Sequence, residues 1–333
     1  MNKQQQYEVI IVGAGPIGLA CGIAAGQMRL RNVIIEKGCL VNSVYHYPVN
    51  MTFFSTSDKI ELGNIPFVSH DDRPTRREAL EYYRRISAFF GLQVQTYETV
   101  LHLQPNTRPQ GGGYLVHTSK GDYRARFVVI ATGFYTHPNL LQVPGEELSK
   151  VKHYFDDPHP YSGHKVLVIG GGNSAVDVAL ETWRKGATVT MAVRGSALKE
   201  GVKYWVKPDI ENRIKEGAIQ AYFNSRAVQI KSDEVILQTP RGMLALPNDF
   251  VFAMTGYHPD FEWLQKLGLT VVNLPHGATL PQFNPQTYET NLPGVFLAGT
   301  VCGGTNTNMW FIENARCHAQ MVMEQIARLL KAT

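Results

Sequence analysis

Apolar residues form short β-branched runs along the chain, separated by longer segments that mix polar and small apolar residues. Runs that are apolar throughout are typical of strands buried on both faces of a parallel sheet. We expect such strands at 7–13, 32–36, 127–131, 165–170, 187–193, 250–254 and 295–298. Segments 19–28 and 174–186 each follow one of these runs and have the composition of helices. Strands that alternate with helices predict an α/β fold with parallel sheets.

A glycine-rich turn joins the first predicted strand to the first predicted helix. Its pattern is Gly13-x-Gly15-x-x-Gly18. The first glycine permits a tight turn, the second lets the backbone approach a pyrophosphate, and the third lets the helix pack on the strand. The next strand ends at Glu36, near the spacing at which a carboxylate binds a ribose hydroxyl. Strand, helix and acid together indicate a dinucleotide site rather than a mere turn. Pro16, Ile17 and Lys37 complete the predicted contacts.

A second turn of the same kind follows the strand at 165–170. Its pattern is Gly170-x-Gly172-x-x-Ala175. The strand after its helix ends at Arg194 rather than at an acid, and an arginine suits a 2′-phosphate. This loop is therefore predicted to bind NADPH rather than NADH, through Gly170, Gly172, Asn173, Ser174 and Arg194. Lys199 and Lys203 either assist that contact or are solvated loop lysines.

Two dinucleotide loops in one chain indicate two dinucleotides, and the usual pair is FAD at the first loop and NADPH at the second. Apolar runs that end at Thr132-Gly133 and Thr255-Gly256 look like the two crossings between domains. We therefore predict a discontinuous FAD domain, 1–133 with 257–333, and an inserted NADPH domain, 134–256. Both domains are expected to be Rossmann-like, with three ββα layers, and Thr132 and Gly133 are expected to contact the FAD.

The C-terminal segment is predicted to complete the flavin site. A strand ends at Gly299-Thr300, where a turn can approach the ribityl chain. A helix follows, with an apolar stripe at positions 312, 315, 319, 322, 326 and 329 and a cap among residues 306–308. If its N-terminus points at the flavin, the amides of Phe311 and Ile312 stabilise negative charge on the reduced ring. The alternative is an ordinary packed terminal helix.

Composition and charge restrict the remaining possibilities. The chain has 333 residues, 44% hydrophobic and 18% charged, and a net charge of +4, which is ordinary for a globular protein. Its densest basic group, Arg73, Arg76 and Arg77, indicates a solvated helix face beginning near Pro74 rather than a nucleic-acid patch. The polar start predicts no signal peptide, and no apolar run approaches the ~20 residues of a membrane helix. Four cysteines without a CxxC or a zinc spacing are typical of a reducing cytosol, so we predict a cytoplasmic protein without a metal.

Longer strings carry a family resemblance over nearly the whole chain. They are the segment 34–67, HYFDDPHPY at 153–161, NDFVFAMTGYHPD at 248–260, YETN at 288–291 and NTNMWFIEN at 306–314. Through them the chain resembles the thioredoxin-reductase-like flavoproteins, and more closely the bacillithiol disulfide reductases. The resemblance implies an FAD- and NADPH-dependent enzyme that reduces a low-molecular-weight thiol disulfide, assembled as a homodimer or homotetramer. Tyr45, Phe53 and Val100 become further candidate cofactor contacts, with membership of the core as the alternative.

If the protein reduces a disulfide, as the resemblance implies, one of its own thiols is a candidate participant. Thioredoxin reductases carry a CxxC ahead of the second glycine loop, and the corresponding residues here are His153 and Asp156. Many bacillithiol disulfide reductase-like proteins carry a cysteine inside the first loop, where this chain has Ile17. Cys302, beside the Gly299-Thr300 turn, is the candidate substitute, because a thiolate attacks a disulfide. The alternatives are a buried Cys302 that acts as a small hydrophobe, and a His153 that is either a proton donor near the flavin or a polar loop residue.

Two other flavoenzyme classes share the plan of two glycine loops. Ferredoxin- or flavodoxin-NADP reductases lack a CxxC, and the string HYFDD is similar to one in that group. Class B flavin monooxygenases are also similar, but their fingerprint is incomplete here, since Val143 replaces its leading phenylalanine and His153-Tyr154 its later His-Ser pair. We predict a disulfide substrate, with electron transfer to a small redox protein as the first alternative and oxygenation as the second.

Overall fold

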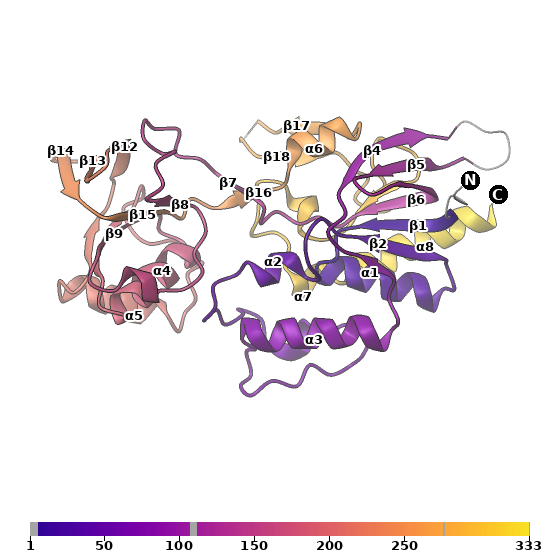
Figure 1. The fold of residues 1–333 in the computed structure, drawn as a ribbon, viewed down its shortest axis with the longest axis horizontal. Helices are drawn as coiled ribbons and strands as arrows, with labels where there is room; N and C mark the ends of the chain where they lie inside the picture. Colours follow the sequence, from indigo (N-terminus) through magenta and orange to yellow (C-terminus); the bar gives the residue numbers. More distant parts are fainter. Residues whose placement is uncertain (1–5, 107–111, 276, 333) are drawn as a thin grey trace. The chain divides into compact units, whose positions relative to one another are not determined.

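The computed structural model describes residues 6–106, 112–275 and 277–332, and it divides into two compact units (Figure 1). The first unit comprises residues 1–47, 51–137 and 257–333, and the second comprises 48–50 and 138–256. The predicted boundary after residue 256 coincides with the observed one, whereas the predicted boundary after residue 133 precedes the observed one, after residue 137. Segment 48–50, predicted in the first domain, belongs to the second unit. Residues 1–5, where no signal peptide is predicted, lie outside the described residues.

The first unit is built on a largely parallel sheet. Its strands are β1 (Gln6–Val12), β2 (Asn32–Ile35), β3 (Val94–Gln95), β4 (Val100–Pro105), β5 (Tyr114–Thr118), β6 (Asp122–Ile130) and β19 (Val295–Leu297). The order is β3-β2-β1-β6-β5-β4, and β19 pairs with the end of β6. Strands β4, β5 and β6 form an antiparallel meander, while the pairs of β1 with β2 and β6, and of β6 with β19, are parallel. The predicted mixture of helices with parallel strands is confirmed.

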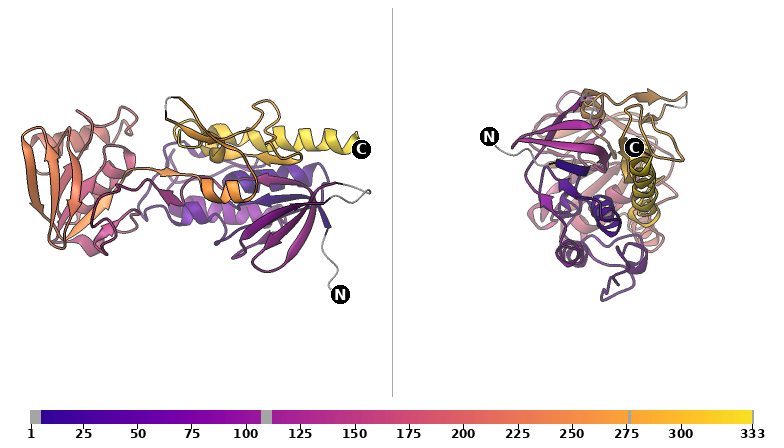
Figure 2. Two further views of the ribbon diagram at one scale, coloured as in Figure 1. Left: turned by 90° about the horizontal axis from the view of Figure 1, so that it is seen from above. Right: turned by 90° about the vertical axis from the view of Figure 1, so that its right-hand side faces the viewer.

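The first unit also contains helices and 3₁₀ turns (Figures 1 and 2). They are α1 (Pro16–Gln27), α2 (Asn42–Tyr45), α3 (Arg76–Phe89), α6 (Phe261–Lys266), α7 (Ile312–Ala315) and α8 (Cys317–Lys331), with 3₁₀ turns η1 (Ser57–Lys59) and η3 (Gly299–Gly303). Helix α1 contacts both the sheet and α8. It is buried from Pro16 to Ala25, and its many small residues allow this close approach on every side. A short antiparallel pair, β17 (Val271–Asn273) and β18 (Thr279–Pro281), lies in the same unit.

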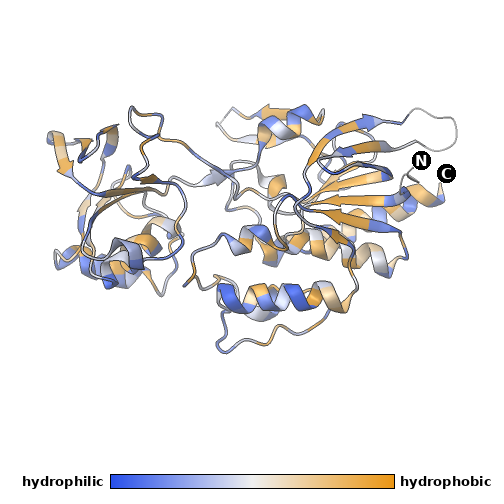
Figure 3. Ribbon diagram, in the orientation of Figure 1, coloured by the Kyte–Doolittle hydropathy of each residue, from blue (hydrophilic) through white to orange (hydrophobic). Residues whose placement is uncertain are grey.

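The basic residues after Pro74 form a solvated helix face, as predicted. Thr75 and Glu78 begin α3 with reciprocal hydrogen bonds to each other's backbone amides. Arg84 and Arg85 both pair with Glu81 on the exposed side of the helix. Figure 3 shows this polar side of α3 in blue, in contrast to the orange strands of the sheet.

The second unit has a parallel sheet of its own. Its strands, in spatial order, are β11 (Gln220–Tyr222), β10 (Thr188–Ala192), β9 (Lys165–Ile169), β15 (Phe250–Ala253) and β8 (Val151–Lys152). Helices α4 (Asn173–Arg184) and α5 (Lys207–Lys215), the 3₁₀ turn η2 (His159–Tyr161) and an antiparallel sheet of β12 (Arg226–Ile230), β13 (Glu234–Thr239) and β14 (Gly242–Pro247) complete it. One core lies between β9, β10, β15 and α4. A second core lies between the parallel and the antiparallel sheets.

Apart from segment 48–50, the chain passes between the units after residues 137 and 256. These passages contain the short strands β7 (His137–Pro138) and β16 (Tyr257–His258), which pair with each other. Both follow the glycine turns at which the sequence predicts a domain crossing, Thr132-Gly133 and Thr255-Gly256. In the part of the chain that the structure describes, no helix is both long and apolar enough to span a membrane.

The C-terminal helix differs from its prediction. Instead of one helix capped among residues 306–308, the chain forms α7 and then α8, and Phe311 precedes the first turn of α7. The reason is local, because the Asn314 side chain accepts a hydrogen bond from the Phe311 amide and donates one to the Met309 carbonyl. The cap therefore comes from inside the helix. Between α7 and α8, Arg316 donates to the Glu61 carbonyl at 2.9 Å.

Candidate active site

Three chain turns of the first unit meet at one edge of its sheet. They follow β1, β6 and β19, which are adjacent parallel strands, so their carboxyl ends lie together. A Cβ atom placed on Gly13 would lie 2.6 Å from the Ala131 carbonyl oxygen, and one placed on Gly133 would lie 3.5 Å from Thr300 Oγ1. The predicted contacts at Gly13, Thr132-Gly133 and Gly299-Thr300 are thus brought together, although the sequence separates them widely. This edge is where parallel α/β sheets bind ligands.

The three glycines of the first loop have different surroundings. Gly13 has φ +106°, a conformation that favours glycine. A Cβ on Gly18 would lie 1.8 Å from the Gly13 carbonyl oxygen, so α1 can approach the turn only without a side chain there. A Cβ on Gly15 would meet nothing within 4 Å. Gly15 also begins α1, with Pro16 in its first turn, so open space lies at a helix N-terminus that favours anions.

Glu36 lies at the carboxyl end of β2, where the sequence predicts it. Its carboxylate is buried and accepts hydrogen bonds from the Ala14 and Gly38 amides, both at 2.8 Å. These two bonds hold the side chain against the first glycine loop. The adjoining Lys37 is exposed. A carboxylate held beside the first glycine loop fits the ribose contact expected for FAD.

A hydrogen bond to His318, a residue that the sequence analysis missed, holds the turn at Gly299 in place. The amide of Gly299 donates to His318 Nδ1 at 3.1 Å, so the other ring nitrogen carries the hydrogen. His318 is fully buried between the rings of Tyr288 and Trp310, each with its centroid 4.4 Å away. Burial lowers the pKa of His318 to about 4, so the ring is neutral near pH 7. Its spacing from two residues of the predicted apolar stripe, positions 315 and 322, was a signal that it faces the core.

Gly299 packs against Ile17, the position at which the family resemblance leads us to expect a cysteine. Gly299 has φ +88°, and a Cβ placed on it would lie 3.1 Å from three atoms of the Ile17 side chain. The first helix and the turn after β19 therefore touch at this pair. Ile17 offers only methyl and methylene groups where a thiol is expected from the resemblance, so the first loop supplies packing at this point.

The three other predicted contacts of the first unit differ in exposure. Tyr45 is 51% exposed, and Arg76 donates to its carbonyl at 3.1 Å. Phe53 and Val100 are buried in the core. The Val100 carbonyl accepts from the Trp263 indole at 2.8 Å. Of the three side chains, only that of Tyr45 is open to solvent.

The Phe311 amide, predicted to face the flavin, has a hydrogen-bond partner within the protein. That amide donates to Asn314 Oδ1 at 2.7 Å, because the Asn314 side chain folds back over the start of α7. It is therefore engaged within the protein rather than directed at a ligand. Ile312, whose amide is the other predicted donor, begins the short helix α7.

The cysteines do not include an accessible thiolate at the predicted place. Cys302 is 2% exposed, and burial raises the pKa of its thiol far above the ordinary value. Cys21 is fully buried in α1, and burial raises its pKa to about 12. Cys39 is partly buried and Cys317 is exposed on α8. These observations weigh against Cys302 as an attacking thiolate and agree with the alternative of a small core residue.

The second unit repeats the design of the first loop. Gly170 has φ +138°, and a Cβ on it would lie 2.5 Å from the Met254 carbonyl oxygen, as Gly13 lies against Ala131. Gly172 is the N-cap residue of α4, and a Cβ placed on it would lie 3.6 Å from the Lys199 side chain. The space beside this glycine is bounded only by a flexible lysine stem, which suits close approach of a phosphate.

Some of the residues considered for NADPH binding after the second loop have partners within the protein, whereas others are exposed to solvent. The Asn173 side chain donates to the Gly201 carbonyl and accepts from the Lys203 amide, so it fastens the loop 201–203. Lys203 is buried, and its Nζ lies 2.8 Å from Asp177 Oδ2. Ser174 is exposed at the start of α4. The structure thus engages Lys203 within the protein, whereas Arg194 is exposed beyond β10.

The positions that correspond to a CxxC carry a histidine–glutamate contact and a hydrogen bond within one loop. His153 Nε2 lies 3.5 Å from Glu146 Oε1, and the same carboxylate accepts from the Leu141 and Gln142 amides. The Asp156 carboxylate accepts a hydrogen bond from the Asp157 amide at 2.7 Å, within the same loop. Both contacts lie wholly within the second unit.

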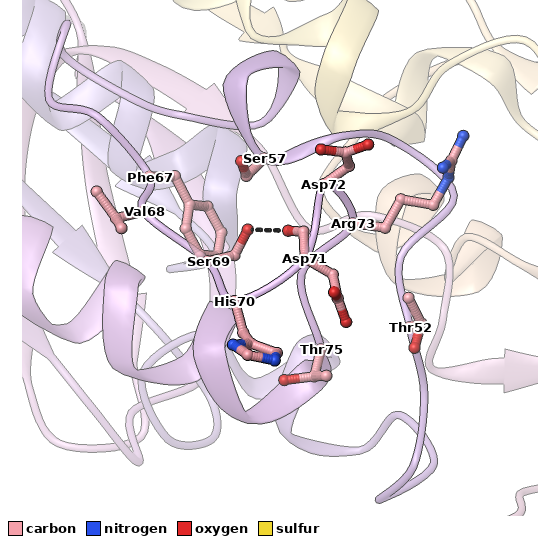
Figure 4. A pocket seen from close by; sticks show the side chains of 10 residues that line it. All are labelled: Thr52, Ser57, Phe67, Val68, Ser69, His70, Asp71, Asp72, Arg73 and Thr75. Carbon is pink, nitrogen blue, oxygen red and sulfur yellow. Dashed lines mark hydrogen bonds between the residues drawn. The ribbon is translucent and has the colours of Figure 1, made fainter.

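One cavity of the first unit lies outside the predicted cofactor set. It has a volume of about 610 Å³ and is lined by Thr52, Ser57 and the loop 67–75 (Figure 4). Figure 4 shows polar side chains around it, with Ser69 hydrogen-bonded to the Asp71 carbonyl. None of the residues predicted to bind a cofactor is among those that line it.

A family model, a protein sequence and a solved structure that match this chain all belong to disulfide reductases or their family. The family model of the pyridine nucleotide-disulphide oxidoreductases matches residues 10–299. Bacilliredoxin reductase Bdr of Bacillus subtilis is 41% identical over 324 residues, 97% of this chain and 98% of that protein. The structure of bacillithiol disulfide reductase Bdr (YpdA) from Staphylococcus aureus has a TM-score of 0.93 at 38% identity, covering 99% of this chain and 100% of that one. A ferredoxin–NADP reductase of Ignicoccus hospitalis is more distant, at 27% identity over 88% of this chain and 90% of that protein.

The matched range includes both glycine loops and the turn at Gly299. The relatives cover nearly the full length of the chain, so the similarity is not limited to one dinucleotide-binding unit. The family resemblance found in the sequence is thereby confirmed. The chain belongs to the pyridine nucleotide-disulphide oxidoreductase family.

Proposed function

We propose that this protein is an NADPH-dependent FAD enzyme that reduces the disulfide of a low-molecular-weight thiol such as bacillithiol. The observation that carries the proposal is the pair of glycine loops, built alike but followed by different ribose-side residues. Glu36 follows the strand after the first loop, and Arg194 follows the strand after the second. The names of two relatives that match nearly the whole chain support the choice of substrate.

The first unit has the features that FAD needs. Open backbone at Gly15 and the start of α1 receive the pyrophosphate, and Glu36 receives a ribose hydroxyl. Thr132, Gly133, Gly299 and Thr300 form the adjoining wall at the same sheet edge. In this proposal the second unit is a Rossmann-like NADPH domain inserted into a Rossmann-like FAD domain.

The chemistry is a transfer of two electrons from NADPH to a disulfide. When bound at the first glycine loop, FAD would supply the two-electron chemistry that links NADPH to the acceptor. The overall balance is one NADPH, one proton and one disulfide converted to NADP⁺ and two thiols. The protein binds and orients the reactants, and the burial of Cys302 weighs against that thiol as a relay of the electrons. We therefore propose direct reduction of the substrate disulfide at the flavin.

Electron transfer to a small redox protein is the second candidate. It is favoured by the same lack of an accessible thiolate at the predicted site, since a ferredoxin needs no thiol chemistry. The name of the first relative, a bacilliredoxin reductase, also points to a protein acceptor.

We further propose that the protein assembles as a homodimer or homotetramer. The molar mass of the purified protein in solution would test this.

A panel of acceptors tests the proposal. NADPH oxidation is followed with bacillithiol disulfide, glutathione disulfide, a bacilliredoxin disulfide, a ferredoxin, a flavodoxin and oxygen alone. We expect the largest kcat/KM with a bacillithiol-containing disulfide and stoichiometric release of thiols. The Gly15→Val variant without FAD is the matched control. Turnover with ferredoxin or flavodoxin but with no disulfide would reject the proposed substrate in favour of the second candidate.

A further inference from the structure

We propose that a cavity in the second unit binds the 2′-phosphate of the adenosine half of NADPH between two arginines, Arg194 and Arg226. The cavity has a volume of about 300 Å³, and both arginines line it together with Gln238 and the turn Thr239-Pro240. Arg194 follows from the sequence pattern, whereas Arg226 lies more than thirty residues later on a different sheet. The inference rests on the proposed use of NADPH and adds the second cation of that site.

Backbone hydrogen bonds bring the two arginines to the same cavity. The segment after β11 runs beside the segment after β10, since the Val193 amide donates to the Tyr222 carbonyl at 2.8 Å. The Ser225 amide then donates to the Val193 carbonyl at 3.0 Å, and the Asn224 amide donates to the Gly195 carbonyl at 2.9 Å. Arg194 is therefore flanked by the residues that lead directly into β12, whose first residue is Arg226.

The guanidinium of Arg226 has a defined orientation. Its Nε donates to Gln238 Oε1 at 2.9 Å, and the two residues are direct partners in the β12–β13 register. This bond uses one edge of the guanidinium and leaves donors on the terminal nitrogens. Because its planar fork suits phosphate oxygens, an arginine held in this way can bind a phosphate with two parallel bonds.

The two arginines differ from other arginines of the second unit in their ion pairs. Among residues 6–106, 112–275 and 277–332, neither Arg194 nor Arg226 forms an ion pair with an acidic side chain. Other arginines of the same unit do, since Arg184 and Arg213 both pair with Asp209. Two guanidinium groups without an acidic partner, both lining one cavity, predict a dianionic ligand, and a ribose 2′-phosphate is such a ligand.

The sequence left undecided whether Lys199 and Lys203 contact the phosphate, and the structure gives each lysine another place. Lys203 is engaged with Asp177 and is buried, so it is not available to a phosphate. Lys199 lies with its stem beside Gly172, at the pyrophosphate loop. Within this arrangement the glycine loop serves the pyrophosphate and the two arginines serve the 2′-phosphate. NADH has a hydroxyl in place of that phosphate, so it gains nothing from either arginine.

Calorimetric binding of adenosine nucleotides to the FAD-loaded full-length protein tests the proposal directly. The probes are 2′,5′-ADP, which carries the 2′-phosphate, and 5′-ADP, which does not. The variants are Arg194→Ala, Arg226→Ala and the double variant. Lys185→Ala is the control, because it removes an exposed positive charge that does not line the cavity. Thermal unfolding of each variant checks that it is folded.

We expect each single substitution to weaken 2′,5′-ADP binding by about ten-fold or more and to leave 5′-ADP binding within about two-fold. The double variant should bind the two nucleotides alike, and Lys185→Ala should behave as the parent protein. Arg226→Lys, which keeps the charge but not the fork, should fall between the parent and Arg226→Ala. In turnover, the same variants should raise the KM for NADPH and leave that for NADH unchanged.

Unchanged 2′,5′-ADP affinity in a folded Arg226→Ala variant would overturn the inference, even if Arg194→Ala loses binding. Equal loss of both nucleotides would also overturn it, because the arginine would then support the fold of the site rather than the phosphate. Equal affinity of the parent protein for both nucleotides would reject the NADPH assignment itself. Tight 2′,5′-ADP binding without reduction of any disulfide would leave this site intact and reject only the proposed substrate.

Discussion

Replacement of Gly15 by valine should separate cofactor binding from folding. A Cβ at this position meets no protein atom within 4 Å, so the folded protein has room for the new side chain. The backbone of Gly15 is extended, with φ −68° and ψ 176°, which valine also adopts. The space that valine fills is the space proposed for the FAD pyrophosphate. We expect a folded protein that purifies without flavin.

The size of the effect follows from the contacts that are lost. A phosphate held by backbone amides gains about 1.5–3 kcal/mol from each charge-assisted hydrogen bond. If valine prevents two such bonds, the loss is about 3–6 kcal/mol, or roughly a hundred- to ten-thousand-fold in FAD affinity. The cost to the protein without FAD should be about 1 kcal/mol or less, since only the first residue of a helix changes.

Gly18→Ala is the matched variant with the opposite expectation. Its Cβ would lie 1.8 Å from the Gly13 carbonyl oxygen, although real Cβ contacts essentially never fall below 3.0 Å, so α1 must shift. Overpacking of this kind costs about 1–3 kcal/mol or more. Gly18→Ala should therefore lower the melting temperature even without FAD, whereas Gly15→Val should not.

The assay is the flavin-to-protein ratio from visible absorbance, with melting temperatures measured with and without added FAD. The parent protein should be stabilised by FAD, and Gly15→Val should not, because a ligand stabilises only the state that binds it. A Gly15→Val protein that retains a full complement of FAD would refute the assignment of the first loop. A Gly15→Val protein that is unfolded would contradict the open space seen beside Gly15.

Two further predictions concern single buried side chains. Cys302→Ala should keep disulfide reduction within about two-fold, because a buried, protonated thiol is a poor nucleophile; a loss of disulfide turnover with flavin content and flavin reduction by NADPH intact would instead show that the thiol takes part. Burial lowers the pKa of His318 to about 4 from 6.5, so its contribution to the free energy of unfolding is complete above pH 6.5 and is lost as the pH falls toward 4. This amounts to about 2 kcal/mol between pH 7 and pH 5, measurable by urea unfolding, and an unchanged pH dependence in His318→Gln would contradict it.

The sequence alone determined the features that depend on local backbone geometry. The two glycine loops require strands before them, helices after them and glycines at fixed spacing, all within about thirty residues of chain. The acid at Glu36 and the arginine at Arg194 end the next strands, so their place beside each loop follows from the same local unit. The lack of a CxxC is likewise evident from the amino-acid sequence. The strings that carry the family resemblance are also recognised without a structure.

The tertiary structure decided everything that depends on which distant segments touch. Only the pairing of β19 with β6 places Gly299 against Ile17, and only the packing of α8 brings His318 to that turn. The burial of Cys302 follows from the same packing, which no spacing rule reports. Arg226 reaches the cavity of Arg194 through hydrogen bonds between segments some thirty residues apart. Sequence periodicity records the face on which a residue lies, whereas contact between elements depends on how the whole chain closes around its cores.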